Sequence, residues 1–429
     1  MSKKITKFAI DTLLKKGADK AECWYIVEKN DELNIHNEDI DLFRTKKNIK
    51  LKLEAIKDNK KGEITLNEVN KENIKKQAKN LIDIALSSKE DPAHDISSEK
   101  ERKTFKRGPE SPDYDLMFEN MDHFIKAVKN DFPKINVEKA IYAFNNIEKT
   151  YHNSNNVFLK SNRYYYNFTT MFLAEDNEKS SSFNYISTAI NDPKQNLLNQ
   201  AELKTLLSQS IDHLNPKPVP EKFVGDIIIT PHALQSLIRF ITSYLRDSAI
   251  ITKRSIYKDK INEKIASDKF NLHSAPLSEK LAYNYFITSD GFIAKDLQII
   301  ENGVLKSFLL SLYGANKTNH KRSLNQGGNF IIEPGDKNLE QIINNTEKGI
   351  ILRRFSGGNP SDSGDFSGIA KNSFYIENGE IKHPLKETMI SGNLASMLKD
   401  IKAISKERIN FGSSIFPWIS TSNFTISSK

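Results

Sequence analysis

The chain has 429 residues, a length that exceeds one ordinary hydrophobic core and indicates two or three domains. Its 63 basic and 55 acidic residues give a formal charge of +8, but they are interspersed, a pattern that disfavours nucleic acid as the main ligand. The single cysteine, Cys23, excludes an intrachain disulfide and a multi-cysteine metal site and favours a reducing cytoplasm. No stretch reaches the ~18 uninterrupted apolar residues that a membrane-spanning helix requires.

The first predicted unit covers residues 1–112 and combines helices with paired strands. Gly17 is expected to end an amphipathic helix, not a targeting segment, whose apolar residues recur at helical spacing: Ile5, Phe8, Ala9 and Leu13. Residues 21–30 and 48–69 alternate as strands do, and residues 70–89 return to helical spacing. Residues 88–112 carry prolines and mixed charge without periodicity, which predicts a linker or loop.

The second predicted unit covers residues 113–220. A helix is expected near residues 115–130, strands rich in Tyr, Phe and Thr from about 140 to 190, and a further helix near 199–214. Three prolines between residues 215 and 222 then interrupt the chain.

The third predicted unit covers residues 221–429 and is rich in β-strands. Ile-Glu-Asn-Gly occurs twice between strand-like flanks, and its Asn302-Gly303 and Asn378-Gly379 pairs suit the positive φ angles of tight hairpins. Helices are expected only near residues 231–245 and 394–404. The sequence therefore predicts an α+β fold, with two small α+β units followed by a β-rich domain of hairpins and few helices.

A loop rich in glycine, serine and aspartate follows Arg353 and is the most distinctive local feature. It lacks the spacing of a phosphate-binding loop, and Ser367 lies one residue too late for a Gly-x-Ser-x-Gly nucleophile. Asp362 and Asp365 could form an acid-base pair only if their carboxylates converge, which spacing does not establish. A turn-rich crossover in which Asp and Ser side chains bind backbone amides is the simpler interpretation.

The histidines do not have the spacing of a catalytic zinc site. The nine histidines are scattered, whereas a zinc hydrolase places two within one helical turn beside a glutamate. His232, at the start of a predicted helix, is the only suggestive one, and Ala233 follows it. A surface or helix-entry role is the simpler interpretation.

Four short segments, in order, resemble the C-terminal signature of the TldD/PmbA family of zinc-dependent peptidases, formerly called modulators of DNA gyrase. They are SGGNP (356–360), GDFS (364–367), IENGEI (376–381) and ISGNL (390–394). Upstream, residues 225–240, 260–267 and 287–318 look like the start and middle of the same domain. The resemblance covers about residues 220–400 and is looser before them.

The resemblance implies a branch of the family as well. TldD-like members carry a His-Glu-x-x-x-His helix and a distant cysteine that hold zinc, whereas the corresponding helix here reads PHALQSLIRFI. The chain therefore looks like a PmbA/TldE-type subunit that binds no metal cofactor itself and forms a heterodimer with a TldD-like subunit, in which zinc is expected. Ser289-Asp290-Gly291 stands where members often have Asp-x-Glu-Gly, which leaves the role of that turn open.

In that picture the complex acts in cytoplasmic proteolysis of small or unfolded peptides, and this chain shapes the substrate chamber without cleaving. No catalytic or metal residue is assigned. The glycine loop is expected either to line the chamber or only to define the fold, through Gly357, Gly358, Asn359, Pro360, Gly364, Asp365, Phe366 and Ser367.

Two alternatives remain open from the sequence. A DNA- or gyrase-associated modulator would bind DNA in a salt-sensitive manner. A stand-alone hydrolase with an unrecognised Asp/Ser site would act without a metal or a partner.

Overall fold

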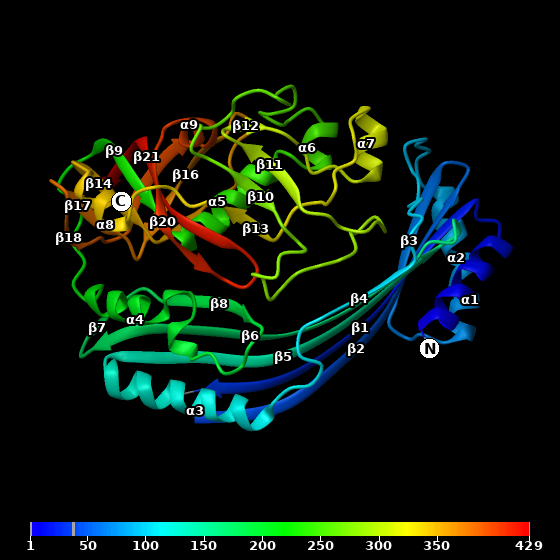
Figure 1. The fold of residues 1–429 in the computed structure, drawn as a ribbon, viewed down its shortest axis with the longest axis horizontal. Coiled ribbons are helices and arrows are strands. Elements are labelled where there is room, and N and C mark those ends of the chain that lie inside the picture. Colours follow the sequence, from blue (N-terminus) through cyan, green and yellow to red (C-terminus); the bar gives the residue numbers. More distant parts are fainter. Residues whose placement is uncertain (1, 37–38, 429) are drawn as a thin grey trace.

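The computed structural model describes residues 2–36 and 39–428, and Figure 1 shows a curved sheet with a second, more compact β-rich body above it. The curved sheet has the strand order β3-β2-β1-β5-β6-β4, with β7 and β8 also on β6. Its strands are β1 (Lys20–His36), β2 (Asp39–Lys57), β3 (Lys60–Leu66), β4 (Lys103–Arg107), β5 (Ile135–Asn153), β6 (Phe158–Asp176), β7 (Lys179–Ser180) and β8 (Asn184–Ile190).

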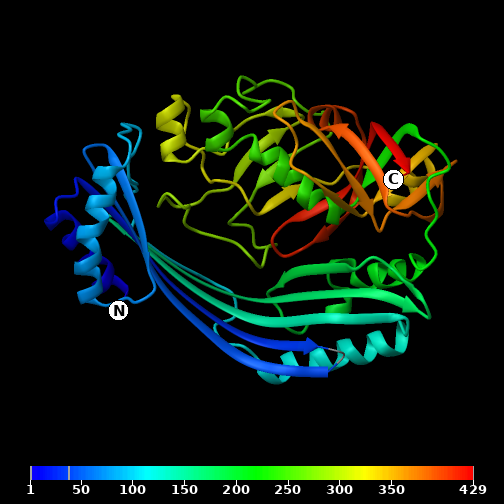
Figure 2. The ribbon, with the colours of Figure 1, turned by 180° about the vertical axis from the view of Figure 1, so that it is seen from behind.

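Two amphipathic helices cover one end of this sheet, as Figure 2 shows from behind. They are α1 (Ser2–Lys15) and α2 (Lys71–Ser87). Their buried faces share one apolar cluster with the start of the sheet, including Ala9, Leu13, Leu53 and Leu81. Gly17 has φ of 99°, so the predicted end of the first helix is confirmed.

Further helices cover the opposite end. They are α3 (Tyr114–Asp131), the 3₁₀ segment η1 (Leu197–Glu202) and α4 (Leu203–Asp212). Phe124 of α3 packs edge to face on Phe168 of β6, with ring centroids 5.2 Å apart. The helices predicted in this region are confirmed.

The first two predicted units share one sheet, because β1 pairs with β5 from Glu22↔Asn153 to His36↔Lys139. Boundaries at residues 112 and 220 stay a prediction, but the strands on either side of the first boundary are hydrogen-bonded neighbours. The predicted linker 88–112 also contains a strand, since β4 pairs in parallel with β6. A strand this short leaves too few residues for alternation to be visible in the sequence.

The β-rich body holds the remaining strands, in the order β12-β11-β10-β13-β21-β9-β14-β17-β18, with β15, β16, β19 and β20 attached. They are β9 (Phe223–Ile229), β10 (Leu272–Ser274), β11 (Leu297–Glu301), β12 (Val304–Leu305), β13 (Phe330–Ile332), β14 (Lys348–Leu352), β15 (Arg354–Gly357), β16 (Asp365–Lys371), β17 (Phe374–Glu377), β18 (Glu380–Pro384), β19 (Thr388–Asn393), β20 (Ile401–Asn410) and β21 (Ile415–Ser428). Its helices are α5 (Pro231–Ser243), α6 (Asp247–Ile251), α7 (Leu312–Thr318), α8 (Leu339–Asn344) and α9 (Leu394–Lys399).

Both predicted hairpins are confirmed. Asn302 and Gly303 have φ of 47° and 77°, and Asn378 and Gly379 have φ of 51° and 75°. They join β11 to β12 and β17 to β18. The α+β prediction is confirmed.

The predicted helix 394–404 was too long. It ends at Lys399, and Ile401 begins β20, where Ile401 and Ala403 are buried and Lys402 is exposed. The short helices α6, α7 and α8 were also missed, because segments of five to seven residues show less than two turns of helical periodicity. Among the described residues, no helix is long and apolar enough to cross a membrane.

Candidate functional site

Helix α5 places His232, the histidine singled out in the sequence, beside a cavity. Thr230 caps the helix and Pro231 occupies its first turn, as their side chains predict. One face is buried in the core, through Leu234, Leu237, Ile238 and Ile241. The other face turns His232, Gln235, Ser236 and Arg239 toward a cavity of about 740 Å³.

His232 is engaged in a structural contact. Its Nε2 lies 3.0 Å from the Ala201 carbonyl oxygen, which can only accept, so Nε2 carries the proton and donates. Burial, together with the positive charge of Arg353, lowers the pKa of His232 to about 4. The ring is therefore neutral at pH 7 and ties α5 to η1.

The residues that His232 meets lie in a strained turn. Ala201 and Glu202 both have positive φ, 48° and 59°, although neither is glycine. Glu202 receives a hydrogen bond from Nη1 of the buried Arg353 at 3.2 Å and lies 3.9 Å from His232 Nε2. Burial raises the pKa of Glu202, while the Arg353 charge opposes that rise.

Zinc does not fit these residues. A structural or catalytic zinc site needs three or four His, Cys, Asp or Glu ligands around one point. Within residues 2–36 and 39–428, no three such side chains come together in a metal-binding arrangement. Cys23 is buried beneath α1, where its Sγ lies 3.7 Å from the Thr6 carbonyl oxygen, and burial raises the pKa of its thiol.

The glycine loop connects β15 to β16 and reaches a second hollow. Asn359, Asp365, Phe366 and Ser367 line this open space of about 750 Å³ together with residues of β19 and β21. Pro360 is half-buried in the loop and is not part of this lining. Whether the loop lines a substrate chamber stays a prediction.

Two of the loop glycines are required by the backbone and one is not. Gly364 has φ of +88°, and a Cβ on Gly357 would lie 2.6 Å from the Ser367 carbonyl oxygen. A Cβ on Gly358 would meet no atom within 4 Å, and the φ of this residue lies outside the left-handed region. Of Gly357, Gly358 and Gly364, the backbone therefore requires glycine at Gly357 and at Gly364.

Asp365 acts as a turn anchor. Its carboxylate accepts hydrogen bonds from Ser363 Oγ at 2.6 Å and from Asn393 Nδ2 at 2.8 Å. These two donors hold the pKa of Asp365 below its usual value. The exposed carboxylate is thereby stabilised as the anion, which agrees with the turn-rich interpretation and not with a proton-donating member of an acid-base pair.

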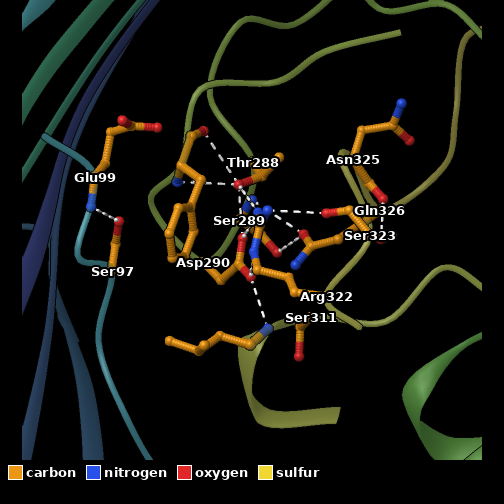
Figure 3. A network of polar contacts seen from close by, with 12 residues as sticks. Ser97, Glu99, Thr288, Ser289, Asp290, Ser311, Arg322, Ser323, Asn325 and Gln326 are labelled. Atoms are coloured by element: carbon orange, nitrogen blue, oxygen red, sulfur yellow. Dashed lines mark hydrogen bonds and ion pairs between the residues drawn. The ribbon is translucent and has the colours of Figure 1, made fainter. Parts of the chain in front are cut away.

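The turn at Ser289-Asp290-Gly291 lies where the β-rich body meets the segment before β4 (Figure 3). Asp290 binds Arg322 through two hydrogen bonds of 2.8 Å and accepts a third from the Leu312 amide at the start of α7. Although burial acts to raise it, Arg322 holds the pKa of Asp290 below its usual value. On the other side, Glu99 Oε2 accepts from the Ile293 amide at 3.2 Å, which links this turn to the chain before β4.

Several residues of the α5 cavity were missed by sequence reasoning. Arg239, Arg353, Arg354, Phe183 and Tyr185 meet there although they come from three separate segments. The spacing of Arg239, two helical turns after His232, was the one local signal that placed both on the same face.

Comparison with known proteins identifies the β-rich body. Residues 223–428 match the family described as PmbA/TldA metallopeptidase C-terminal domain. The chain is 28% identical over 194 residues to a zinc metalloprotease TldD homolog of Saccharolobus solfataricus and 27% identical over 202 residues to a metalloprotease PmbA homolog of Haemophilus influenzae. These alignments cover 42% and 46% of this chain, and they span 44% of the length of each relative, that is, less than half.

A solved structure extends the similarity of fold to the whole chain. The crystal structure of TldE from Thermococcus kodakarensis superposes with a TM-score of 0.83 at 18% identity, covering 99% of this chain and 100% of that one. The shared fold therefore includes the curved sheet as well as the β-rich body.

Proposed function

The chain belongs to the PmbA/TldD family through its C-terminal domain, and from this premise we propose that it is the PmbA/TldE-like subunit of a zinc-dependent peptidase. In this proposal a TldD-like subunit supplies the zinc and the hydrolytic water. The present chain shapes the chamber into which small or unfolded peptides enter, and it does not cleave them. The site of action is intracellular, in keeping with one buried, unpaired cysteine.

The composition of α5 carries this proposal. His232 is the one histidine on the helix, its Nε2 is committed to the Ala201 carbonyl, and Gln235 and Arg239 occupy the next two turns of the same face. Neither an amide nor a guanidinium is a usual zinc ligand. A helix with these residues supports a role in binding or shaping instead of hydrolysis.

An exposed apolar patch offers a surface for the partner. The β2–α3 patch consists of Phe43, Tyr114 and Phe118, each more than a third exposed. Phe43 packs on Tyr114 and Phe118 with ring centroids 5.3 and 6.0 Å apart, so the three rings form one surface. β3 pairs with β2 only from Leu51 onward, and in the described part of the chain no strand pairs with the outer edge of β2 before that point.

Apolar side chains beside an open strand edge are typical of surfaces that bind another protein. We expect the TldD-like chain to cover this patch. An obligate interface should bury upwards of ~2,000 Å² and survive gel filtration.

Reconstitution tests the proposal. The purified chain alone should contain no stoichiometric zinc and should leave an unfolded peptide uncut, because no three possible zinc ligands come together within residues 2–36 and 39–428. Mixed with a TldD-like chain from the same genome, it should co-elute and cleave the peptide, and a chelator should abolish cleavage. One zinc per lone chain together with peptide cleavage would place the protein on the other branch of the family.

A matched pair of variants tests the surface. Phe43→Asp should prevent co-elution by placing a charge within the apolar patch. Ile84→Asp, at a similarly exposed apolar position on α2, should leave the complex intact. Equal co-elution of both variants would show that the β2–α3 patch lies outside the interface.

A further inference from the structure

The cavity beside α5 is lined by cations and by no carboxylate. Arg239, Arg353, Arg354 and Lys371 contribute to its walls, and among the described residues that line it none is Asp or Glu. Two of these cations are paired with carboxylates that do not line the cavity, Arg353 with Glu202 at 3.2 Å and Lys371 with Glu387 at 2.9 Å, so the cations still outnumber the nearby anions. Like charges gathered around a cavity raise its affinity for an anion. The interspersed charges of the sequence as a whole give no hint of this local excess.

Two of these cations retain capacity for a ligand. Arg239 is exposed, and in the described part of the chain its guanidinium contacts only the ring of the neighbouring Phe240, 5.8 Å from the ring centroid. Arg353 is only 6% exposed, and although its Nη1 binds Glu202, its Nε has no partner within the described residues. A buried donor without a partner is costly, and the Arg353 side chain must shift before an acceptor in the cavity can reach this nitrogen.

The same cavity has an aromatic wall. Phe183 and Tyr185 are 46% and 50% exposed, and their rings stack with centroids 6.5 Å apart. Arg354 is fixed against them, because its guanidinium lies 4.3 Å from the Phe183 centroid and Nη1 donates to the Phe183 carbonyl oxygen at 3.1 Å. Exposed aromatic rings beside fixed guanidinium groups suit a ligand with both apolar and anionic parts.

We propose that this cavity binds a carboxylate-bearing peptide, with Arg239 and Arg353 facing the carboxylate and Phe183 and Tyr185 contacting the adjacent side chain. The carboxylate is either the C-terminus of the peptide or an Asp or Glu side chain. This inference rests on the proposed function, since it takes peptides as the molecules that enter. It adds a preference for acidic or C-terminal segments.

The geometry favours a short peptide over a nucleic acid. The space of about 740 Å³ holds a few residues, and it lies between β8, α5 and β15 instead of on an open convex face. Gln235, Ser236 and Ser356 add neutral hydrogen-bonding groups to its walls, as expected for a site that also binds backbone amides. Planar guanidinium groups match the two oxygens of a carboxylate.

Peptide binding to the lone full-length chain tests the proposal. The probe is a Gly-Ala-Glu-Ala-Gly peptide with a free C-terminus, labelled at its N-terminus with an uncharged BODIPY dye, and it is compared with its Glu-to-Gln form, its amidated form and the form with both changes. Fluorescence anisotropy should show saturable binding that the doubly changed peptide loses. Loss on amidation alone assigns the C-terminal carboxylate, and loss on the Glu-to-Gln change alone assigns the side chain.

Three variants test the residues. Arg239→Gln and Tyr185→Ala should each weaken binding by about tenfold or more, because both side chains are exposed and their removal leaves the fold intact. Lys75→Gln on α2 removes the same charge at an exposed position far along the chain and should change nothing. Unchanged binding in both cavity variants would overturn the proposal, as would equal binding of the doubly changed peptide.

A phosphoserine peptide that binds more than tenfold tighter than the glutamate peptide would also overturn the proposal, in favour of a phosphate site.

The peptide-binding test and the reconstitution test can be told apart by their outcomes. Binding without any cleavage by the mixed subunits would leave the cavity proposal standing, and cleavage without binding to the lone chain would leave only the subunit proposal.

Discussion

Three glycines of the β15–β16 loop give a prediction with an internal control. Gly364→Ala places a side chain at φ of +88°, which costs about 1–2 kcal/mol of unfolding free energy. Gly357→Ala brings Cβ to 2.6 Å from both the Ser367 carbonyl oxygen and the Phe355 ring, and overpacking of this kind costs about 1–3 kcal/mol. Gly358→Ala meets no atom within 4 Å, so we expect a change between zero and a gain of about 1 kcal/mol.

Urea unfolding followed by tryptophan fluorescence measures these differences. The chain has two tryptophans, Trp24 in the curved sheet and Trp418 in β21, so a shared Trp24→Phe background leaves Trp418 to report on the β-rich body. Gly357→Ala and Gly364→Ala should lower the midpoint at an unchanged slope, and Gly358→Ala should not. The reasoning fails if Gly358→Ala is as destabilising as the others, or if all three keep the parent midpoint.

Other consequences concern buried charges and DNA. Burial, together with the negative charge of Glu54, raises the pKa of Glu22 from its ordinary value of 4.5 to about 7. Between these two pH values the carboxyl of Glu22 is protonated in the folded chain and ionised in the unfolded chain. The unfolding free energy should therefore fall as pH rises from about 4.5 through 7, and Glu22→Gln should flatten that slope; parallel urea-midpoint curves from pH 5 to 8 would contradict this. Arg353→Met should cost about 3–5 kcal/mol in the same assay because it leaves Glu202 buried and unpaired, and a second change, Glu202→Gln, should recover much of the loss; an additive double variant would refute the coupling. DNA affinity should be weak and should collapse between roughly 50 and 200 mM salt in a filter-binding titration, whereas sequence-selective sub-micromolar binding at physiological salt would favour the DNA-associated alternative.

Local signals predicted the local parts of the fold. Gly17, Asn302-Gly303 and Asn378-Gly379 each specify their own backbone angles, so their positions were found from two or three residues. The pairing of β1 with β5 was not found, because any two alternating strands satisfy the same pattern and the choice between partners depends on packing across the whole sheet.

One part of the candidate site could also be recognised from the sequence, and the other could not. The β15–β16 loop was recognisable because its glycines and turn residues are contiguous. In contrast, Arg239 and Arg354 look like ordinary surface cations in the sequence, and Phe183 looks like one more apolar strand residue. Only the approach of β8 to α5 and β15 brings these side chains to the wall of one cavity.

The length of the strands in the curved sheet has a consequence for synthesis. Strands β1, β2, β5 and β6 have 17 to 19 residues, and β1 lies between β2 and β5. While the ribosome is still translating α3, the nascent chain already contains β1, but the residues that pair with its second edge, up to Asn153, have not emerged. That edge must stay exposed or be shielded for the time needed to add them, and pairing across so long a stretch of chain is slow. We therefore expect the nascent chain to depend on chaperones during this interval.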